Sequence, residues 1–350
     1  MKPIWVAQDK SRWLKRRANR GALWLSYRLR LLCALGLPHI LMIEPTNECN
    51  LRCPLCPTGA GTLKRPKGQM SLDLYRRILA DLDASLERVM LYNYGEPFVH
   101  PRILDMIAAA HQAEVYTRVS TNGLAFLRSI STDDLITSGL DYLRVSVDGA
   151  TPETYNVYRV GGNLDRVLEG MRLLQERKRQ LGKRKPIVEL QFIVMSHNEH
   201  EIPLIRQTAR ELGVLLRLKS VGLGDLYADP AKRAWLPEDT SLRRYDEGFK
   251  LARNGHYVCD HPWRRLVVNW DGQVTPCCYD PNGEHEFGNA AEGIGAVWNG
   301  EHLQTFRQAI QSSSPPAICQ NCSVSLWNSP KMGRVERPDT VAFATPGKVD

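Results

Sequence analysis

The chain has 350 residues, of which 43% are hydrophobic and 24% are charged, and this composition excludes intrinsically disordered, collagen-like and coiled-coil proteins. The net charge of +8 is unevenly placed, because residues 1–38 carry nine lysines and arginines against one acid. The rest of the chain holds as many acids as bases, so we predict no nucleic-acid partner.

The first 38 residues form a basic arm that also contains Trp5, Trp13 and Trp24. Such a mixture is typical of a segment on an anionic membrane surface, and equally of a helix that caps a domain. No stretch reaches the ~20 apolar residues that span a bilayer, and Arg28 and Arg30 interrupt the apolar run that a signal peptide would need. We expect a cytoplasmic protein, with peripheral membrane contact through the arm as the alternative.

Residues 39–225 alternate between strand-like and helix-like runs. Strands are expected at His39–Glu44, Arg88–Tyr92, Val115–Ser120, Tyr142–Val147, Val188–Met195 and Leu215–Val221. Helices are expected between them at Leu72–Leu82, Pro101–Glu114, Asp133–Ser138, Leu164–Leu181 and Glu201–Leu212. This α/β alternation implies parallel βαβ units. By itself it fits a doubly wound sheet or an incomplete barrel.

The alternation stops after residue 225. We assign residues 226–255 to a linker, 256–330 to a smaller, turn-rich domain that bears cysteines, and 331–350 to an unstructured tail. The smaller domain has no strong helix before Glu301–Ile310, so we expect a bound metal to stabilise it.

A cluster of three cysteines follows the first expected strand. Cys49, Cys53 and Cys56 have the spacing C-x₃-C-x₂-C. Three thiolates suit a [4Fe–4S] cluster in which one iron keeps an open position. The alternative, a zinc knuckle, needs a fourth ligand nearby, and none follows until His100.

This cysteine loop resembles the hallmark of the radical S-adenosylmethionine (SAM) superfamily, and the resemblance covers residues 38–225. It implies a partial (β/α)₆ barrel in which the open iron binds the amino and carboxylate groups of SAM. It further implies that an electron from the cluster cleaves SAM, and that the 5′-deoxyadenosyl radical so formed takes hydrogen from a substrate. A reductant such as flavodoxin or ferredoxin would supply the electron.

Motifs at later strand ends extend the resemblance. Tyr94-Gly95-Glu96-Pro97 stands where the family has Gly-Gly-Glu-Pro, so Tyr94 departs from the pattern. By resemblance, Glu96 accepts hydrogen bonds from the SAM ammonium, Gly95 lets the backbone approach SAM, and Arg159 grips the SAM carboxylate. The full set implied for SAM binding is Gly95, Glu96, Ser120, Asn122, Ser146, Arg159, Val194 and Met195, the last two beside the adenine.

A second set of cysteines lies in the smaller domain: Cys259, Cys277, Cys319 and Cys322. Four thiols can fully ligate a second iron–sulfur cluster or a zinc ion. Their surroundings resemble the SPASM family of C-terminal radical SAM extensions. No further cysteines follow, which resembles the shorter, single-cluster twitch version. The ligand spacing also resembles that of a twitch-type dehydrogenase acting on an amino-cyclitol. The sequence leaves open whether Cys277 or its neighbour Cys278 is the ligand.

A fully ligated auxiliary cluster has no position for SAM, so we expect it to carry electrons during a net oxidation, which also needs a base. Asp280, Tyr279 and His261 adjoin the auxiliary ligands and are the candidates. Our main functional interpretation is oxidation or epimerisation of a small molecule such as a sugar, cyclitol or lipid head group. The alternatives are a peptide-modifying maturase, which the short arm makes less favoured, and a non-catalytic electron carrier.

Overall fold

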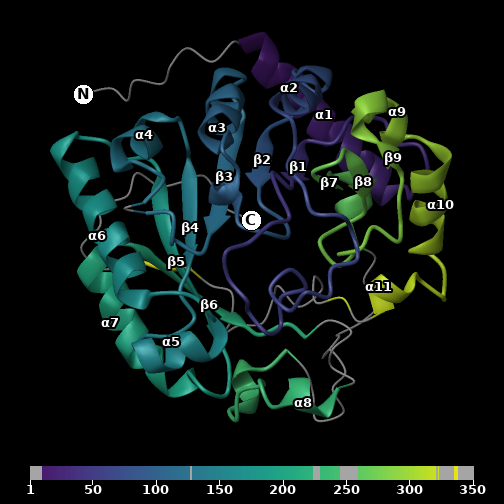
Figure 1. Cartoon of the computed structure of the whole chain (residues 1–350). Helices are drawn as coiled ribbons and strands as arrows, with labels where there is room; N and C mark the ends of the chain where they lie inside the picture. Colours follow the sequence, from purple (N-terminus) through teal and green to yellow (C-terminus); the bar gives the residue numbers. More distant parts are fainter. Residues whose placement is uncertain are drawn as a thin grey trace.

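The computed structural model describes residues 10–126, 128–223, 229–244, 259–320, 322 and 335–337. Within these residues the strands form one ten-stranded sheet in the order β10-β6-β5-β4-β3-β2-β1-β7-β8-β9. Figure 1 shows this curved sheet with helices along its outer side. We call the opposite side the inner face.

The six strands expected from the sequence are confirmed, and their bounds differ from those expected by one or two residues. They are β1 (Ile40–Ile43), β2 (Arg88–Leu91), β3 (Tyr116–Thr121), β4 (Tyr142–Ser146), β5 (Ile187–Val194) and β6 (Leu215–Ser220). Each pairs in parallel with its neighbour. Because their carboxyl ends meet at one edge, the loops after these strands lie on one side of the molecule.

The expected helices are present as α2 (Leu72–Asp81), α3 (Ile103–Gln112), α4 (Thr132–Thr137), α6 (Leu164–Gln180) and α7 (Ile202–Leu212). A helix that the sequence analysis missed, α5 (Pro152–Tyr158), is short, and Thr151 caps it by accepting from the Thr154 N–H. Short 3₁₀ turns η1 (Pro97–Val99) and η2 (Glu199–Glu201) follow β2 and β5.

Side chains alternate along the strands, as the pleat requires. Leu190, Phe192 and Val194 of β5 are buried in the main core against the helices. The intervening Glu189 and Gln191 point to the inner face, and both are also buried. Charged and polar residues are thus concentrated inside the curve of the sheet.

The smaller domain continues the sheet. Strand β7 (Arg265–Val268) pairs in parallel with β1, with Ile40 opposite Arg265. Strands β8 (Gln273–Thr275) and β9 (Gly288–Asn289) follow in antiparallel pairing. The remaining elements are η5 (His261–Trp263), η6 (Ala290–Glu292), α9 (Ile294–Trp298), α10 (Glu301–Ala309) and α11 (Ala317–Gln320). Of these elements only α10 was expected, because the others are too short to show a helical pattern of apolar residues in the sequence.

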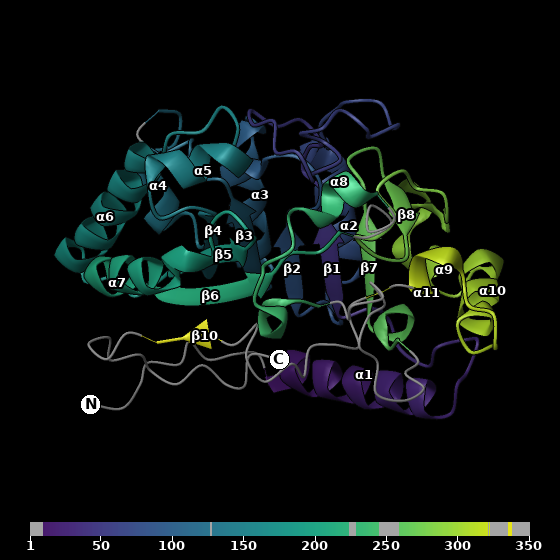
Figure 2. The same ribbon diagram turned by 90° about the horizontal axis from the view of Figure 1, so that it is seen from below.

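The arm forms helix α1 (Lys10–Arg28), which Figure 2 shows outside the layer of strands and on the side opposite the loops that follow them. The expected linker, 226–255, lies partly outside the described residues; within it are α8 (Pro230–Arg233) and η4 (Thr240–Leu242). The tail after residue 330 was expected to be unstructured, but it contains β10 (Val335–Glu336), which pairs with β6. An ion pair between Glu336 and Arg206 at 2.9 Å also holds this strand in place.

Candidate functional site

The loop after β1 carries Cys49, Cys53 and Cys56. Cys53 is buried and the other two are half-buried. All three pack into an apolar cluster distinct from the main core, together with Leu51, Leu55, Tyr158, Met195, Val221, Leu223 and Leu236. The loop is closed by a turn in which the Cys56 N–H donates to the Cys53 carbonyl at 3.1 Å. The three thiols therefore share one apolar environment.

The thiols suit an iron–sulfur cluster better than a single ion. Burial raises the pKa of the Cys49 thiol to about 12, so its ionisation needs the positive charge of a metal. Ligands of one zinc ion are close together because a Zn–S bond is only about 2.3 Å long. Among the described residues, no set of three ligating groups within 4.8 Å of one another includes these cysteines. Thiols that are spaced more widely than the ligands of one ion fit a cluster in which each thiolate binds a separate iron.

Glu96 is buried and holds three hydrogen bonds from protein groups. Its Oε1 accepts from the Thr121 hydroxyl at 2.7 Å and the Phe98 N–H at 3.1 Å, and its Oε2 accepts from the Asn122 N–H at 2.7 Å. A carboxylate has about four acceptor positions, so one position on Oε2 is left for a ligand. Burial raises the pKa of Glu96, and these hydrogen bonds oppose that rise.

Asn122 joins Glu96 to the cysteine loop. Its side-chain amide donates to Asn50 Oδ1 at 2.7 Å and lies 4.0 Å from Cys49 Sγ. The Glu96 N–H donates to the Glu48 carbonyl at 2.8 Å. Two residues predicted to bind SAM are therefore held directly against the loop predicted to bind the cluster.

Close packing of the backbone requires a glycine at position 95, for a reason that the sequence did not reveal. Its φ is +94°, and a Cβ there would lie 2.8 Å from Asn47 Cα and from the Glu48 carbonyl oxygen. We expected this glycine to admit a ligand. The structure shows that it admits the backbone of residues 46–48, which leads into the cysteine loop.

Arg159 reaches the same loop from the end of α5. Its Nε donates to Asp148 Oδ2 at 2.7 Å, and its NH1 lies 3.8 Å from Cys53 Sγ. Asp148 is buried and also accepts from the Ile193 N–H at 2.7 Å. Asp148 stands two residues after Ser146 at the end of β4 and fixes the direction of the guanidinium.

The other predicted SAM-binding residues are less directly connected. Ser146 is buried and accepts from Gln191 Nε2 at 3.3 Å, and Ser120 is half-buried at the end of β3. Met195 belongs to the apolar cluster of the cysteines. Val194 differs from its prediction, because the alternation of β5 directs it into the main core.

The structure also gathers the auxiliary cysteines. The charges that act on the Cys259 thiol include those of Cys322 and Cys319, and burial, the largest effect, raises the pKa of Cys259 to about 12. Burial also raises the pKa of Cys277, and the charges of Cys278, Cys322 and Cys259 add to the rise. Cys322 thus acts on cysteines from two other segments of the smaller domain.

Cys278 faces different neighbours. Burial raises the pKa of its thiol, and the charges of Lys219, Arg265 and Arg244 oppose that rise. Lys219 and Arg265 lie on strands of the sheet. The two adjacent cysteines therefore point into different surroundings.

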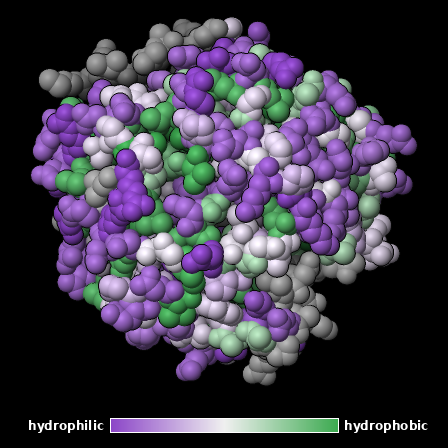
Figure 3. Space-filling view, viewed as in Figure 1, coloured by the Kyte–Doolittle hydropathy of each residue, from purple (hydrophilic) through white to green (hydrophobic). Residues whose placement is uncertain are grey.

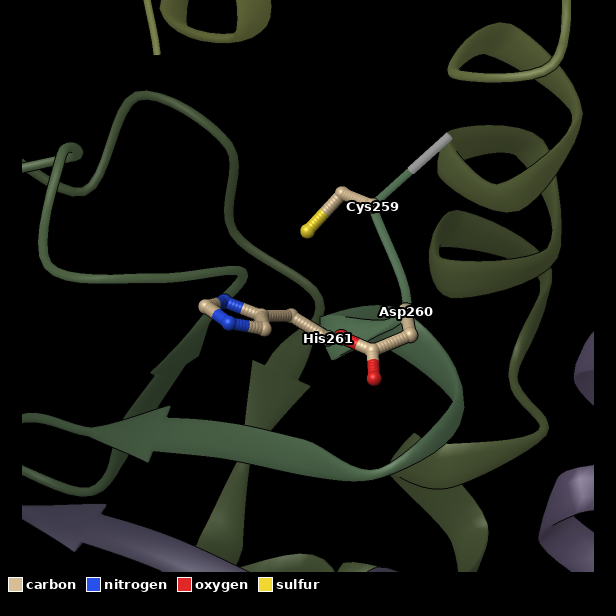
Figure 4. Close-up of side chains that lie close together, drawn as sticks. All are labelled: Cys259, Asp260 and His261. Atoms are coloured by element: carbon tan, nitrogen blue, oxygen red, sulfur yellow. The ribbon is translucent and has the colours of Figure 1, made fainter. Parts of the chain in front are cut away.

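Cys259, Asp260 and His261 form a compact group, with one potential ligand atom of each within 4.8 Å of the others. Figure 4 shows the Cys259 sulfur and the His261 ring directed toward the same space. Burial lowers the pKa of His261 to about 3, so the imidazole is neutral. Its Nδ1 is buried without a hydrogen-bond partner.

A family model of the radical SAM superfamily matches residues 43–202, and a model of the SPASM iron–sulfur cluster-binding domain matches residues 259–323. The chain belongs to the radical SAM superfamily. It is an enzyme of this superfamily with a C-terminal SPASM domain, which sets aside the interpretation as a non-catalytic electron carrier.

Curated relatives match across both domains of this radical SAM enzyme. A tungsten-containing aldehyde ferredoxin oxidoreductase cofactor-modifying protein of Pyrococcus furiosus is 28% identical, over 81% of this chain and 87% of the relative. A PqqA peptide cyclase of Granulibacter bethesdensis is 25% identical, over 81% and 79%. The crystal structure of Streptococcus suis SuiB bound to S-adenosylmethionine shares the fold, with a TM-score of 0.60 and 15% identity over 87% of this chain and 81% of SuiB.

The radical SAM domain binds a [4Fe–4S] cluster and SAM, and the SPASM domain binds auxiliary iron–sulfur. The part of the chain that the structure describes contains no helix long and apolar enough to cross a membrane.

The inner face carries charges that the sequence analysis missed. Glu189 accepts from Tyr142 Oη at 2.5 Å, Arg144 Nε at 2.5 Å and Arg217 Nε at 2.9 Å. Lys219 lies two positions beyond Arg217 on β6 and so points to the same side. Burial lowers the pKa of Lys219 to about 8, and the charges of Arg244 and Arg144 lower it further. In the sequence, the alternation of bases with leucines in the sixth strand was the signal that could have revealed these charges.

Tyr94, the departure from the family motif, connects the two cysteine regions. Its hydroxyl donates to the Cys278 carbonyl at 2.5 Å, and its N–H donates to Glu44 Oε1 at 3.3 Å. Glu44 and Arg65 form a buried two-fold ion pair at 2.8 Å, and Arg65 Nε donates to the Pro281 carbonyl at 2.7 Å. We call these residues the junction.

The predicted bases have contrasting environments. Asp280 is buried, and its two oxygens accept from the Glu284 N–H at 2.8 Å and the His285 N–H at 2.9 Å. These two bonds hold its own loop together. Tyr279 is half-buried, and His261 is neutral beside Cys259.

Proposed function

We propose that this radical SAM enzyme is a maturase that modifies a peptide or a peptide-derived cofactor precursor. The observation that carries the proposal is the alignment of relatives over both domains, since the PqqA peptide cyclase and a mycofactocin maturase of Mycobacterium tuberculosis each match more than 80% of the chain. The proposal favours the peptide alternative over the small-molecule interpretation.

In this proposal Cys49, Cys53 and Cys56 hold the catalytic cluster, which with SAM supplies a radical able to abstract hydrogen. Glu96 accepts from the SAM ammonium through its remaining Oε2 position, and Arg159, directed by Asp148, binds the SAM carboxylate. Support comes from their contacts with the cysteine loop at Cys49 and Cys53. Further contacts are assigned to Gly95, Ser120, Asn122, Ser146 and Met195.

Cys259, Cys277, Cys319 and Cys322 are the proposed ligands of the auxiliary cluster. The support for Cys277 over Cys278 is electrostatic, because the charges of Cys322 and Cys259 are among those that raise the pKa of Cys277, whereas the charges that act most on Cys278 are those of Lys219 and Arg265. When bound, this cluster would accept electrons from the substrate.

The inner face favours a substrate with an acidic group. Glu189 already forms ion pairs with Arg144 and Arg217, so two positive charges balance its single negative charge. Lys219 adds a further positive charge, close enough to Arg244 and Arg144 for their charges to lower its pKa. A carboxylate of a peptide substrate would relieve this repulsion.

The test uses the reconstituted, reduced full-length protein with SAM. Synthetic short peptides encoded beside the gene are supplied in one arm, and sugar and cyclitol compounds in the other, while 5′-deoxyadenosine and substrate mass are measured. We expect one peptide to lose hydrogen in step with 5′-deoxyadenosine. The Cys49→Ala/Cys53→Ala/Cys56→Ala variant should form neither product. Turnover of small molecules alone would overturn the proposal.

A further inference from the structure

Helix α1 attaches to the body of the protein mainly through charged residues, and Leu23 is its one large aliphatic residue that is buried in the core. Arg12 forms an ion pair with Asp83 at 2.7 Å, and Arg20 forms one with Glu87 at 2.6 Å. Arg16 NH1 donates to the Glu114 carbonyl at 3.1 Å. In most surface helices the apolar side faces the core, so the attachment of α1 leaves its apolar side to be explained.

Four large apolar residues of α1 point to solvent, whereas Leu23 is buried. We name Trp13, Leu14, Trp24 and Leu25, together with Leu29 directly after the helix, the α1 stripe. Their exposed fractions are 46%, 58%, 63%, 39% and 60%. Leu14, Ala18, Gly21 and Leu25 recur at helical spacing, which places them in one row along the outer side. Leu32 and Leu35, at 36% and 60% exposure, extend the apolar surface past the helix.

Two arginines lie among the residues of this stripe and have no ion-pair partner among the described residues. The Arg17 guanidinium lies over the Trp13 ring at 5.4 Å, and Arg28 lies over Trp24 at 5.9 Å. Helix α1 contains seven lysines and arginines and no acid. An exposed apolar row that carries tryptophans and arginines and no acid matches helices that lie in the interface of a bilayer.

The stripe also lies away from the catalytic end of the molecule. Helix α1 attaches to Glu87 and Glu114, which lie just before β2 and β3. Cys49 and Glu96, by contrast, follow β1 and β2. Figure 2 shows α1 on one side of the sheet and the loops after the strands on the other. Figure 3, which views the molecule as Figure 1 does, shows hydrophobic residues interspersed among hydrophilic ones. A surface bound to α1 would leave the catalytic end open.

We propose that the α1 stripe binds the surface of an anionic lipid bilayer. The occupant follows from charge, since phosphate head groups complement Arg17 and Arg28 while the acyl region receives Trp24 and Leu25. A second copy of the chain fits poorly, because a two-fold interface would bring the arginines of one stripe against the same arginines of the other. The proposal concerns location and does not depend on the substrate.

The experiment measures co-sedimentation of the full-length holoprotein with vesicles of phosphatidylglycerol and phosphatidylcholine, and with phosphatidylcholine alone. We expect binding to the anionic vesicles that falls steeply with salt. In the Trp24→Ser/Leu25→Ser variant we expect binding at least ~10-fold weaker. Arg17→Gln/Arg28→Gln should weaken binding and remove much of its salt dependence.

The matched control is Leu204→Ser, which removes a leucine of similar exposure, 41%, on α7, and should bind as the wild type does. Iron content and circular dichroism verify that each variant is folded. Failure of the wild type to bind anionic vesicles, or equal binding by the Trp24→Ser/Leu25→Ser variant, would overturn the proposal. So would a dimer, seen by sedimentation velocity, that this variant dissociates.

Discussion

The two cysteine regions of this radical SAM enzyme are built in different ways. Cys49, Cys53 and Cys56 occupy one loop that its own backbone bonds close, with the Cys56 N–H on the Cys53 carbonyl and the Ala60 N–H on the Cys56 carbonyl. Cys259, Cys277, Cys319 and Cys322 come from separate segments that β7, β8 and α10 hold apart. The first geometry is local, whereas the second depends on the tertiary structure.

The junction makes the second region depend on the first. Glu44 at the end of β1 holds Arg65, and Arg65 and Tyr94 reach carbonyls in the loop of Cys278 and Pro281. Since the same loop carries Cys277, a change at the junction should disturb the auxiliary cysteines more than the catalytic ones. The predictions below test this difference.

The largest effect is expected from Cys277→Ala. It should remove the auxiliary cluster, which holds about half of the iron if both clusters are [4Fe–4S], and should leave the catalytic cluster in place. Cys278→Ala is the matched control and should keep its iron. Iron and sulfide analysis with electron paramagnetic resonance measures both. The reverse pattern would show that Cys278 is the ligand.

Arg65→Met tests the junction. The variant leaves the Glu44 carboxylate buried and unpaired, and the side chains of this pair are only 5% and 0% exposed. We expect the free energy of unfolding to fall by about 3–5 kcal/mol, as measured by denaturant titration. Glu44→Gln/Arg65→Met removes both charges and should recover part of the loss. A single variant as stable as the wild type would contradict this assignment.

Lys219→Met tests the charge of the inner face. Burial lowers the pKa of Lys219 from 10.5 to about 8, so below pH 8 the folded protein holds a desolvated charge that the unfolded chain solvates freely. We expect the variant to be more stable than the wild type at pH 7. Its advantage should shrink as the pH rises from 8 toward 10.5, because the unfolded chain then binds more protons than the folded one. An advantage that does not change with pH would argue against this placement.

The smallest effect is expected from Tyr94→Phe. The variant loses the hydrogen bond to the Cys278 carbonyl at 2.5 Å, and we expect the free energy of unfolding to fall by about 0.5–1.5 kcal/mol. Iron content should be unchanged, and the signal of the auxiliary cluster should shift more than that of the catalytic cluster. Tyr92→Phe, on the same strand end, is the control. A shift confined to the catalytic cluster would refute the role of the junction.

Much of the core was predictable because its signals are local. The alternation of runs predicted six parallel strands, and the spacing of Cys49, Cys53 and Cys56 predicted a cluster loop. Glu96 and Asn122 were identified from strand-end motifs and Arg159 from its resemblance to an arginine of the family, and all three contact this loop or its neighbours. Each signal lies within a few residues of the element that positions the side chain.

Other features were decided only by contacts between distant segments. The pairing of β7 with β1 and the contact of Tyr94 with the Cys278 carbonyl have no sequence signature. The same is true of α1. Its sequence determined that Trp13 and Trp24 would be mixed with bases, but only packing decided which side faces the protein. Asp83 and Glu87 attract the bases inward, and the apolar row is left outside.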